Sequence, residues 1–255
     1  MNEFVLRCLI SCVIATVLYF VSAGVVSHFW GRKVARDTVR YDIRLGLISL
    51  LSGTPMLQVF AWSAEKYHFT KLYMSIGDYG WGYWLLSLPL YVLCWDFVFY
   101  LTHLVLHWPL VYRKSHFRHH SCRPPVPWSG VAIDPFETIL SGIMPYTIPL
   151  LVFPFHIYTV YALNIVLMFW ATIVHSSLNW SGNAILLGTR DHNLHHNFGL
   201  KNRNFAAVFT FWDRLCGTID RQTIPPWWGM KEAWTPKTGA SASQLGANPS
   251  DQSDK

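Results

Sequence analysis

Five long apolar runs constrain this chain more than any other feature of its sequence. They cover residues 8–26, 45–62, 79–103, 138–155 and 157–174. A helix rises about 1.5 Å per residue, so each run is long enough to cross the hydrocarbon core of a bilayer. Charged residues make up only 13% of the chain, whereas soluble domains carry about 25%. We therefore predict an all-α fold, an integral membrane bundle of five helices.

Three of the runs leave an alternative open. The first could be a signal peptide, since residues 21–23 resemble a cleavage site. Its uncharged length exceeds the roughly 7–15 residues of a signal core, which favours a retained helix. The fourth and fifth runs are separated only by a short break at residues 154–156. We predict a tight helical hairpin there, and a re-entrant pair that never crosses is the alternative.

The distribution of Lys and Arg predicts the orientation. Basic residues are frequent after the first, third and fifth runs, while the connection between the second and third holds only Lys66 and Lys71, offset by Glu65 and Asp78. Positive residues favour the cytosolic side. We expect the N-terminus outside and the C-terminus in the cytosol, in the endoplasmic reticulum of a eukaryote or the inner membrane of a bacterium. No Lys/Arg block is long enough to indicate a nucleic-acid partner.

The cysteines indicate neither a disulfide framework nor a thiolate metal site. The five cysteines are odd in number and form no Cys-x-x-Cys pair. A disulfide framework or a thiolate zinc site is therefore not expected.

Histidine is the unusual residue of this sequence. Eight of the twelve histidines fall into three short motifs: His103 and His107; His116, His119 and His120; and His192, His195 and His196. Helical positions i, i+3 and i+4 share one face, so each motif can direct two or three rings to one point. The predicted orientation places all three motifs at the cytosolic edge of the membrane.

This number of imidazoles indicates more than one metal ion. Neutral imidazole suits iron, zinc, copper and nickel, and eight rings exceed the four ligands of a tetrahedral zinc site. His175, which closes the fifth run, is a candidate ninth ligand. We predict a cytosolic, histidine-rich di-metal cap built from residues 103–120 and 175–196. His28, His68 and His156 are interpreted as interfacial side chains without a metal.

The three motifs, in this order and spacing, resemble the fatty acid hydroxylase and sterol desaturase superfamily of membrane di-iron enzymes. Two further stretches are similar to that superfamily: residues 125–137, with Pro-Val-Pro-Trp and Pro-Phe-Glu, and residues 212–218, with Trp-Asp and Gly-Thr. The resemblance runs from about Tyr91 to Thr218. Asp134 departs from it, because many relatives have histidine before the proline.

The resemblance implies the chemistry. Its metal ligands are His103, His107, His116, His119, His120, His192, His195 and His196, with His175 as the extra candidate. It implies two iron ions, O₂ as co-substrate and an external electron donor, a cytosolic b-type cytochrome or a ferredoxin with an NAD(P)H reductase. The expected function is hydroxylation or desaturation of an unactivated C–H bond in a sterol, fatty acyl chain or related membrane lipid. Side chains alone cannot attack such a bond, so the hard chemistry falls to a cofactor.

Two other functions remain open. The same core could process aldehydes in wax-type chemistry. A non-enzymatic metal transporter is disfavoured, because its ligands would lie near the bilayer midplane rather than at one edge.

Four acidic residues are candidates for holding the histidines in place. Ligating histidines usually donate their second N–H to a carboxylate or a carbonyl. Asp96 lies on nearly the same helical face as His103, although a hydrogen bond between helices would explain it equally well. Asp213 is the second candidate. Asp191 and Glu137 could act similarly, and a helix N-cap or a solvated charge is as compatible with these two.

The sequence also predicts the domain organisation. Residues 1–234 are expected to form a single membrane-embedded catalytic domain. Residues 235–255 are rich in Ser, Ala, Gly and Pro, which is typical of a disordered polar tail.

Overall fold

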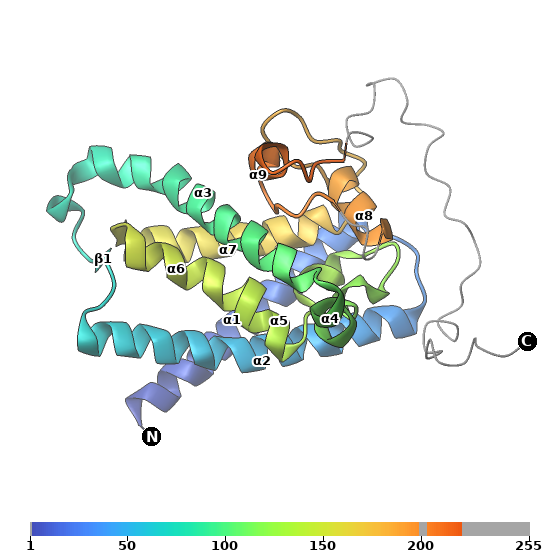
Figure 1. Cartoon of the computed structure of the whole chain (residues 1–255). Coiled ribbons are helices and arrows are strands. Elements are labelled where there is room, and N and C mark those ends of the chain that lie inside the picture. Colours follow the sequence, from blue (N-terminus) through green and yellow to red (C-terminus); the bar gives the residue numbers. More distant parts are fainter. Residues whose placement is uncertain (1, 199–202, 221–255) are drawn as a thin grey trace, which may run out of the picture.

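The chain folds into an elongated bundle of helices. The computed structural model describes residues 2–198 and 203–220; the predicted tail at 235–255 lies outside them. Within these described residues, five helical segments are long and apolar enough to cross a membrane: α1 (Glu3–Trp30), α2 (Arg36–Tyr67), α3 (Gly80–Leu106), the composite segment Pro135–Val152 and α7 (Ile157–Val174). Figure 1 shows them running side by side along the bundle. The predicted all-α class is confirmed, with one two-stranded pair of two residues each in addition.

Most of the long helices extend beyond their apolar runs. α7 has the bounds expected from the sequence, whereas α2 begins at Arg36, well before the run at 45–62. The charged first turns of α2 add helix without adding apolar length, which explains the difference. Hydropathy predicts the part of a helix that matches the hydrocarbon core and not the part that projects into the headgroups.

The fourth span is not a single regular helix. It consists of α5 (Pro135–Glu137), the π-helical η5 (Thr138–Ile143) and α6 (Met144–Val152). Pro145 and Pro149 lie in this stretch and lack the N–H that a regular helix requires. A π-helical turn absorbs such an irregularity while keeping the backbone bonded within the segment.

A small parallel strand pair joins two connections at one end of the bundle. β1 (Leu72–Tyr73) precedes the 3₁₀ turn η1 (Ile76–Asp78) and pairs with β2 (Phe155–His156), with Leu72 opposite Phe155. The turn between α6 and α7 therefore lies at the same end as the connection between α2 and α3 (Figure 1). This arrangement favours a hairpin running the length of the bundle over a re-entrant pair.

Short helices cover the opposite end. After α3 come α4 (Pro109–Val111), the π-helical η2 (Tyr112–His116), and the 3₁₀ helices η3 (His119–Ser121) and η4 (Pro127–Val131). After α7 come α8 (Thr189–Phe198) and α9 (Thr210–Leu215). Figure 1 shows α4, α8 and α9 at this end, away from β1.

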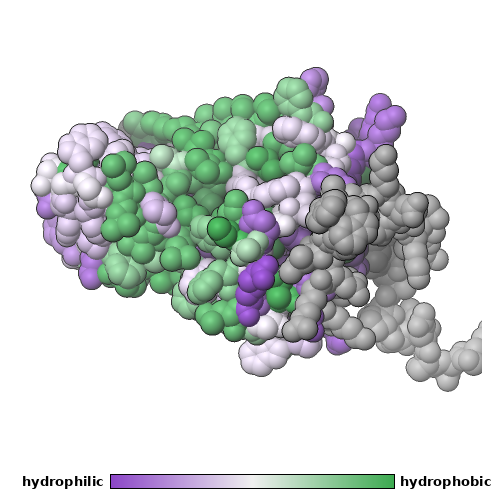
Figure 2. Space-filling view, turned by 90° about the horizontal axis from the view of Figure 1, so that it is seen from above, coloured by the Kyte–Doolittle hydropathy of each residue, from purple (hydrophilic) through white to green (hydrophobic). Residues whose placement is uncertain are grey.

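The outer surface is apolar along the middle of the bundle. On α1, Leu9, Val13 and Val17 are each more than half exposed. Figure 2 shows a hydrophobic band between two more hydrophilic ends. Transfer of such side chains from water to lipid is favourable. A helix that is apolar on all sides therefore requires an apolar surrounding. The protein is a multi-pass membrane protein.

Candidate metal centre

Four stretches of chain bring nine histidines together at the covered end of the bundle. Each ring is at most 7% exposed. Their nitrogens form two groups, and within each group they lie within 4.8 Å of one another. Cluster A contains His103, His107, His116, His120 and His195. Cluster B contains His119, His175, His192 and His196. Every histidine proposed from the sequence as a ligand lies in one of these clusters.

Each of the two His-x-x-His-His motifs contributes two rings to one cluster and one ring to the other. The first and last histidines of a motif share a cluster: His116 and His120 lie in A, and His192 and His196 lie in B. The second histidine goes to the other cluster. In α8 the i+4 position lies about 40° to one side of position i and the i+3 position about 60° to the other side, so one α-helical turn faces both clusters. The first motif reaches the same division across the end of the π-helical η2 and the start of the 3₁₀ helix η3.

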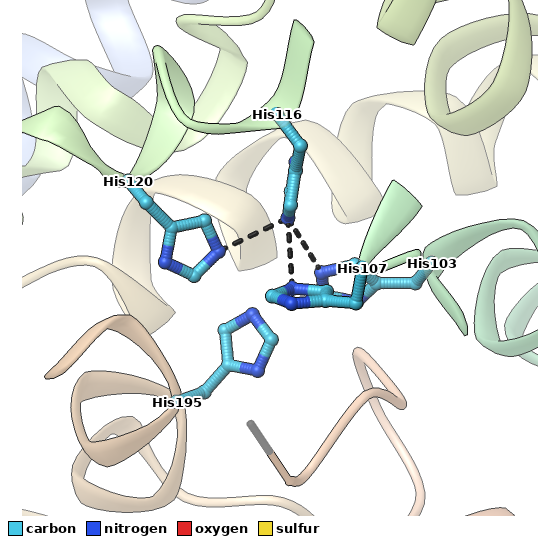
Figure 3. Close-up of side chains that lie close together, drawn as sticks. All are labelled: His103, His107, His116, His120 and His195. Carbon is cyan, nitrogen blue, oxygen red and sulfur yellow. Dashed lines mark hydrogen bonds between the residues drawn. The ribbon is translucent and has the colours of Figure 1, made fainter. Parts of the chain in front are cut away.

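Cluster A is centred on the Nε2 atom of His116 (Figure 3). That nitrogen lies 3.2 Å from Nε2 of His103 and 3.0 Å from Nε2 of both His107 and His120. His195 completes the group from α8, with its ring facing the others. Nitrogens bound to one ion at about 2.1 Å and at right angles would be about 3.0 Å apart. The spacing in cluster A is therefore that of neighbouring ligands on one ion.

Cluster B is centred on the Nε2 atom of His175. It lies 3.0 Å from Nε2 of His192, 3.1 Å from Nε2 of His196 and 3.3 Å from Nε2 of His119. His175 is the C-cap of α7 and has no neighbouring histidine in the sequence. It lies at the centre of cluster B, and its role as a ninth ligand stays a prediction.

Backbone carbonyls fix the tautomers of three of these rings. Nδ1 of His103 lies 2.7 Å from the Phe205 carbonyl oxygen, and Nδ1 of His175 lies 2.6 Å from that of Ala171. Nδ1 of His195 lies 2.9 Å from the Arg203 carbonyl oxygen. A carbonyl only accepts, so each Nδ1 carries the proton and each Nε2 of these neutral rings presents a lone pair.

The imidazole lone pairs that converge in each cluster favour binding of a cation between the rings. Three other nitrogens surround Nε2 of His175 at 3.0–3.3 Å. Its single lone pair can accept well from only one donor. Burial leaves no water to relieve the remaining nitrogens, whose desolvation costs free energy unless a partner is supplied. A metal ion bound to all four rings satisfies them together.

The rings are held in the neutral form that binds metal. Burial, more than the neighbouring rings, keeps the pKa values of His120, His192 and His196 well below the usual range. Burial also lowers the pKa of His119 to about 4. Protons therefore do not compete for these nitrogens near neutral pH. Five nitrogens in cluster A exceed the four of a structural zinc site, and a site of imidazoles without thiolate fits iron.

Glu137 contacts a cluster A ring, that of His116, on the side away from the other histidines. Nδ1 of His116 lies 2.7 Å from Oε1 of Glu137, and both side chains are 2% exposed. Asp134 caps α5 by accepting from the Glu137 N–H at 2.9 Å, and it also accepts from Ser115 Oγ at 2.8 Å. The sequence left Glu137 as a histidine partner, a helix N-cap or a solvated charge. The structure places it against the histidine and gives the cap to Asp134.

Asp96 and Asp213 hold one segment between them. Asp213 accepts from the N–H groups of Phe205 and Ala206, each at 2.9 Å. Asp96 accepts from the next three N–H groups, those of Ala207, Val208 and Phe209, at 2.8–2.9 Å. These five consecutive donors fix residues 205–209, whose first carbonyl accepts from His103. Asp96 thus acts on His103 through the backbone and not by a direct hydrogen bond.

Asp191 and three backbone carbonyls play roles that the sequence analysis did not predict. Asp191 accepts from the N–H groups of Gly182 and Gly188 and so closes the loop before α8. The carbonyls of Ala171, Arg203 and Phe205 have no side-chain signature, and sequence reasoning missed them. His156 lies at the far end, where Nε2 bonds the Met74 carbonyl oxygen at 2.9 Å.

Fold and site define a class: a multi-pass membrane protein whose helices converge on two adjoining, buried histidine clusters at one end. The model of the fatty acid hydroxylase family matches residues 88–218, close to the extent expected from the motifs. This chain belongs to the fatty acid hydroxylase family.

Its relatives include fungal proteins. The Delta(7)-sterol 5(6)-desaturase of Schizosaccharomyces pombe is 35% identical over 183 residues, which cover 72% of this chain and 60% of that protein. The proteins of that name from Candida dubliniensis and Saccharomyces cerevisiae are each 28% identical, covering 84% and 87% of this chain and 56% and 62% of theirs. The chain thus spans about 60% of the length of these relatives. No solved structure matches it.

Proposed function

We propose that this protein is an O₂-dependent oxidoreductase that binds one iron ion in each histidine cluster and desaturates or hydroxylates an unactivated C–H bond of a membrane lipid. The observation that carries the proposal is the division of nine buried imidazoles into adjoining groups of five and four. Family membership supports iron as the metal.

In this mechanism the two iron ions supply the one-electron and O₂ chemistry that side chains lack. The protein contributes orientation and exclusion of water. Carbonyls of Phe205, Ala171 and Arg203 hold the Nδ1 protons of three ligands, which keeps each Nε2 lone pair directed inward. Glu137 accepts from Nδ1 of His116 and makes that ring a stronger donor to the metal.

A sterol is the first substrate to test. The fungal relatives are named as sterol desaturases, and a sterol or a long-chain acyl lipid would reach the clusters from the surrounding bilayer. Desaturation removes two hydrogens from adjacent carbons, while hydroxylation inserts one oxygen. Which of them occurs depends on how the substrate carbon is held. Aldehyde processing on the same core is the second candidate.

We further propose that the histidine end faces the cytosol and receives electrons there from a b-type cytochrome or a ferredoxin. The Lys/Arg distribution supports this orientation. Cys216 is exposed and directly follows α9 at the histidine end of the bundle. In intact cells or right-side-out vesicles, a membrane-impermeant maleimide should label Cys216 only after the membrane is opened. Labelling of closed vesicles at Cys216 would reverse the assignment.

Expression with lipid profiling tests the reaction. The protein would be produced in a host lacking such an enzyme, with its sterols and acyl lipids analysed by mass spectrometry with and without O₂. We expect a new product that lacks two hydrogens or gains one oxygen. It should disappear in His116→Ala and persist in His28→Ala, an exposed histidine outside both clusters.

Other outcomes separate the alternatives. Iron in the purified protein with altered aldehydes, but without a new double bond or hydroxyl group, would favour aldehyde processing. Metal that crosses a vesicle membrane without lipid chemistry would favour transport and contradict the proposal. The extent of the catalytic domain, proposed as residues 1–234, can be tested by truncation after residue 234 with unchanged product formation.

A further inference from the structure

A groove lies at the edge of the histidine end, next to cluster A. Its volume is about 410 Å³, within the range of roughly 300–1,000 Å³ common for ligand sites. α4 and η2 form one wall, and the start of α5 forms the other; Figure 1 shows α4 and α5 close together. The walls are mainly apolar, with cations at the rim: Leu110, Val111, Pro135 and Phe136, and Lys114 and Arg118.

The groove lies where spanning helices end. α3 stops at Leu106 and the fourth span starts at Pro135, so the groove is at the depth of lipid headgroups. The segment between them exposes large apolar side chains: Trp108 is 70% exposed and Leu110 is 66% exposed. Exposed Trp and Leu beside basic residues are typical of an element that lies in the membrane interface.

The rim of the groove is positively charged. Arg118 pairs with Asp134 at 2.5 Å, so its charge is largely compensated. Lys114 is exposed and has no ion pair within the described part of the chain, and the neighbouring Arg113 is exposed too. An apolar cleft with an uncompensated cation at its mouth matches a ligand that has an acyl chain and a negative headgroup.

We propose that this groove binds an anionic phospholipid, with its phosphate at Lys114 and the start of an acyl chain against Leu110 and Phe136. Lipid binding in this groove does not require the oxidation chemistry. The buried residues Ser115 and Asp134 also line the groove and connect it to the histidine centre. Ser115 precedes His116, and Asp134 accepts from the Glu137 N–H. A bound lipid restrains the residues that hold Glu137 against His116.

Native mass spectrometry of the purified full chain tests this site. The probes are dioleoylphosphatidylglycerol and dioleoylphosphatidylcholine, added at equal concentration. One lysine near a bilayer surface favours an anionic lipid by roughly fivefold. We expect the wild type to bind phosphatidylglycerol about that much more tightly at one site. Lys114→Gln should lose this preference, and Lys114→Arg should keep it.

Lys33→Gln is the matched control. Lys33 is also exposed and follows α1 at the same end of the bundle, so its loss removes equal charge away from the groove. A retained preference in this variant supports the proposal. An equal loss in both variants would mean a general surface potential and would overturn it, as would equal binding of the two lipids by the wild type. If soluble polyglutamate displaced phosphatidylglycerol in a Lys114-dependent manner, the site would belong to an acidic protein instead.

Discussion

The imidazole of His116 and the carboxylate of Glu137 lie 2.7 Å apart, and each side chain is 2% exposed. His116 is also the ring around which cluster A is arranged, because its Nε2 is 3.0–3.2 Å from three other histidines. One buried residue thus links the proposed metal to a carboxylate on a different helix. The electron density at Nε2 depends on what Nδ1 donates to, so Glu137 influences the ligand strength of His116.

Glu137→Gln should weaken metal binding in cluster A with little change in the fold. Glutamine keeps an acceptor for the Nδ1 proton of His116 but removes the negative charge. Loss of such a partner typically lowers metal affinity by roughly 10–100-fold. The measurement is iron retained per chain after challenge with a chelator. Glu65→Gln, an exposed residue paired with Arg7, should behave as wild type. Wild-type retention in Glu137→Gln would show that the contact does not tune the site.

Asp213→Asn should loosen the segment that supports His103. An amide offers one oxygen in place of two, so either the Phe205 or the Ala206 N–H loses its acceptor. A buried donor left without a partner costs about 1–3 kcal/mol. We expect a lower midpoint of thermal unfolding in detergent and a faster loss of iron. Asp78→Asn, at an exposed site of the far end, should leave both unchanged. An unaltered unfolding midpoint in Asp213→Asn would contradict the role assigned to this carboxylate.

Single histidine substitutions should remove one ion at a time. His107 belongs to cluster A and His192 to cluster B. If each cluster binds its own ion, His107→Ala and His192→Ala should each retain about half of the wild-type iron, and the double variant almost none, because metal affinity depends on the number of ligands present. Inductively coupled plasma mass spectrometry measures this directly. A complete loss of iron from either single variant would mean that the clusters bind as one unit.

Cys122 should be unreactive in the folded protein. It is 2% exposed, and burial, followed by the nearby Asp42 carboxylate, raises the pKa of its thiol to about 12. Only the thiolate reacts, and a raised pKa keeps Cys122 protonated at mildly alkaline pH. Iodoacetamide should therefore modify exposed Cys216 and not Cys122 until denaturant is added, as read by peptide mapping. Equal modification of both residues in the native protein would contradict the packing around Cys122.

Local sequence patterns were sufficient to predict the helices and the gathering of the histidines at one end of the bundle. Residues 157–174 form α7 with the bounds expected from hydropathy, because a run that must satisfy its backbone within lipid has little alternative to a helix. The histidine motifs likewise predicted that their rings meet at one end, and the structure brings these eight rings together with that of His175. Metal binding by them stays a prediction. A spacing of three or four residues determines which face of a helical turn each ring occupies, and this depends only on neighbouring residues in the sequence.

The partition of the rings and the identity of their supports depended on tertiary structure. His119 and His120 are adjacent in the chain but belong to different clusters: Nε2 of His120 lies 3.0 Å from that of His116, whereas Nε2 of His119 lies 3.3 Å from that of His175. Asp96 was a candidate partner for a histidine, yet it binds the backbone of residues 207–209. The sequence by itself determined that this chain spans a membrane and carries enough imidazoles for a metal centre. Only the folded arrangement decided which nitrogens meet and which carbonyls and carboxylates hold them, because those contacts join segments whose separation in the chain leaves no periodic signal.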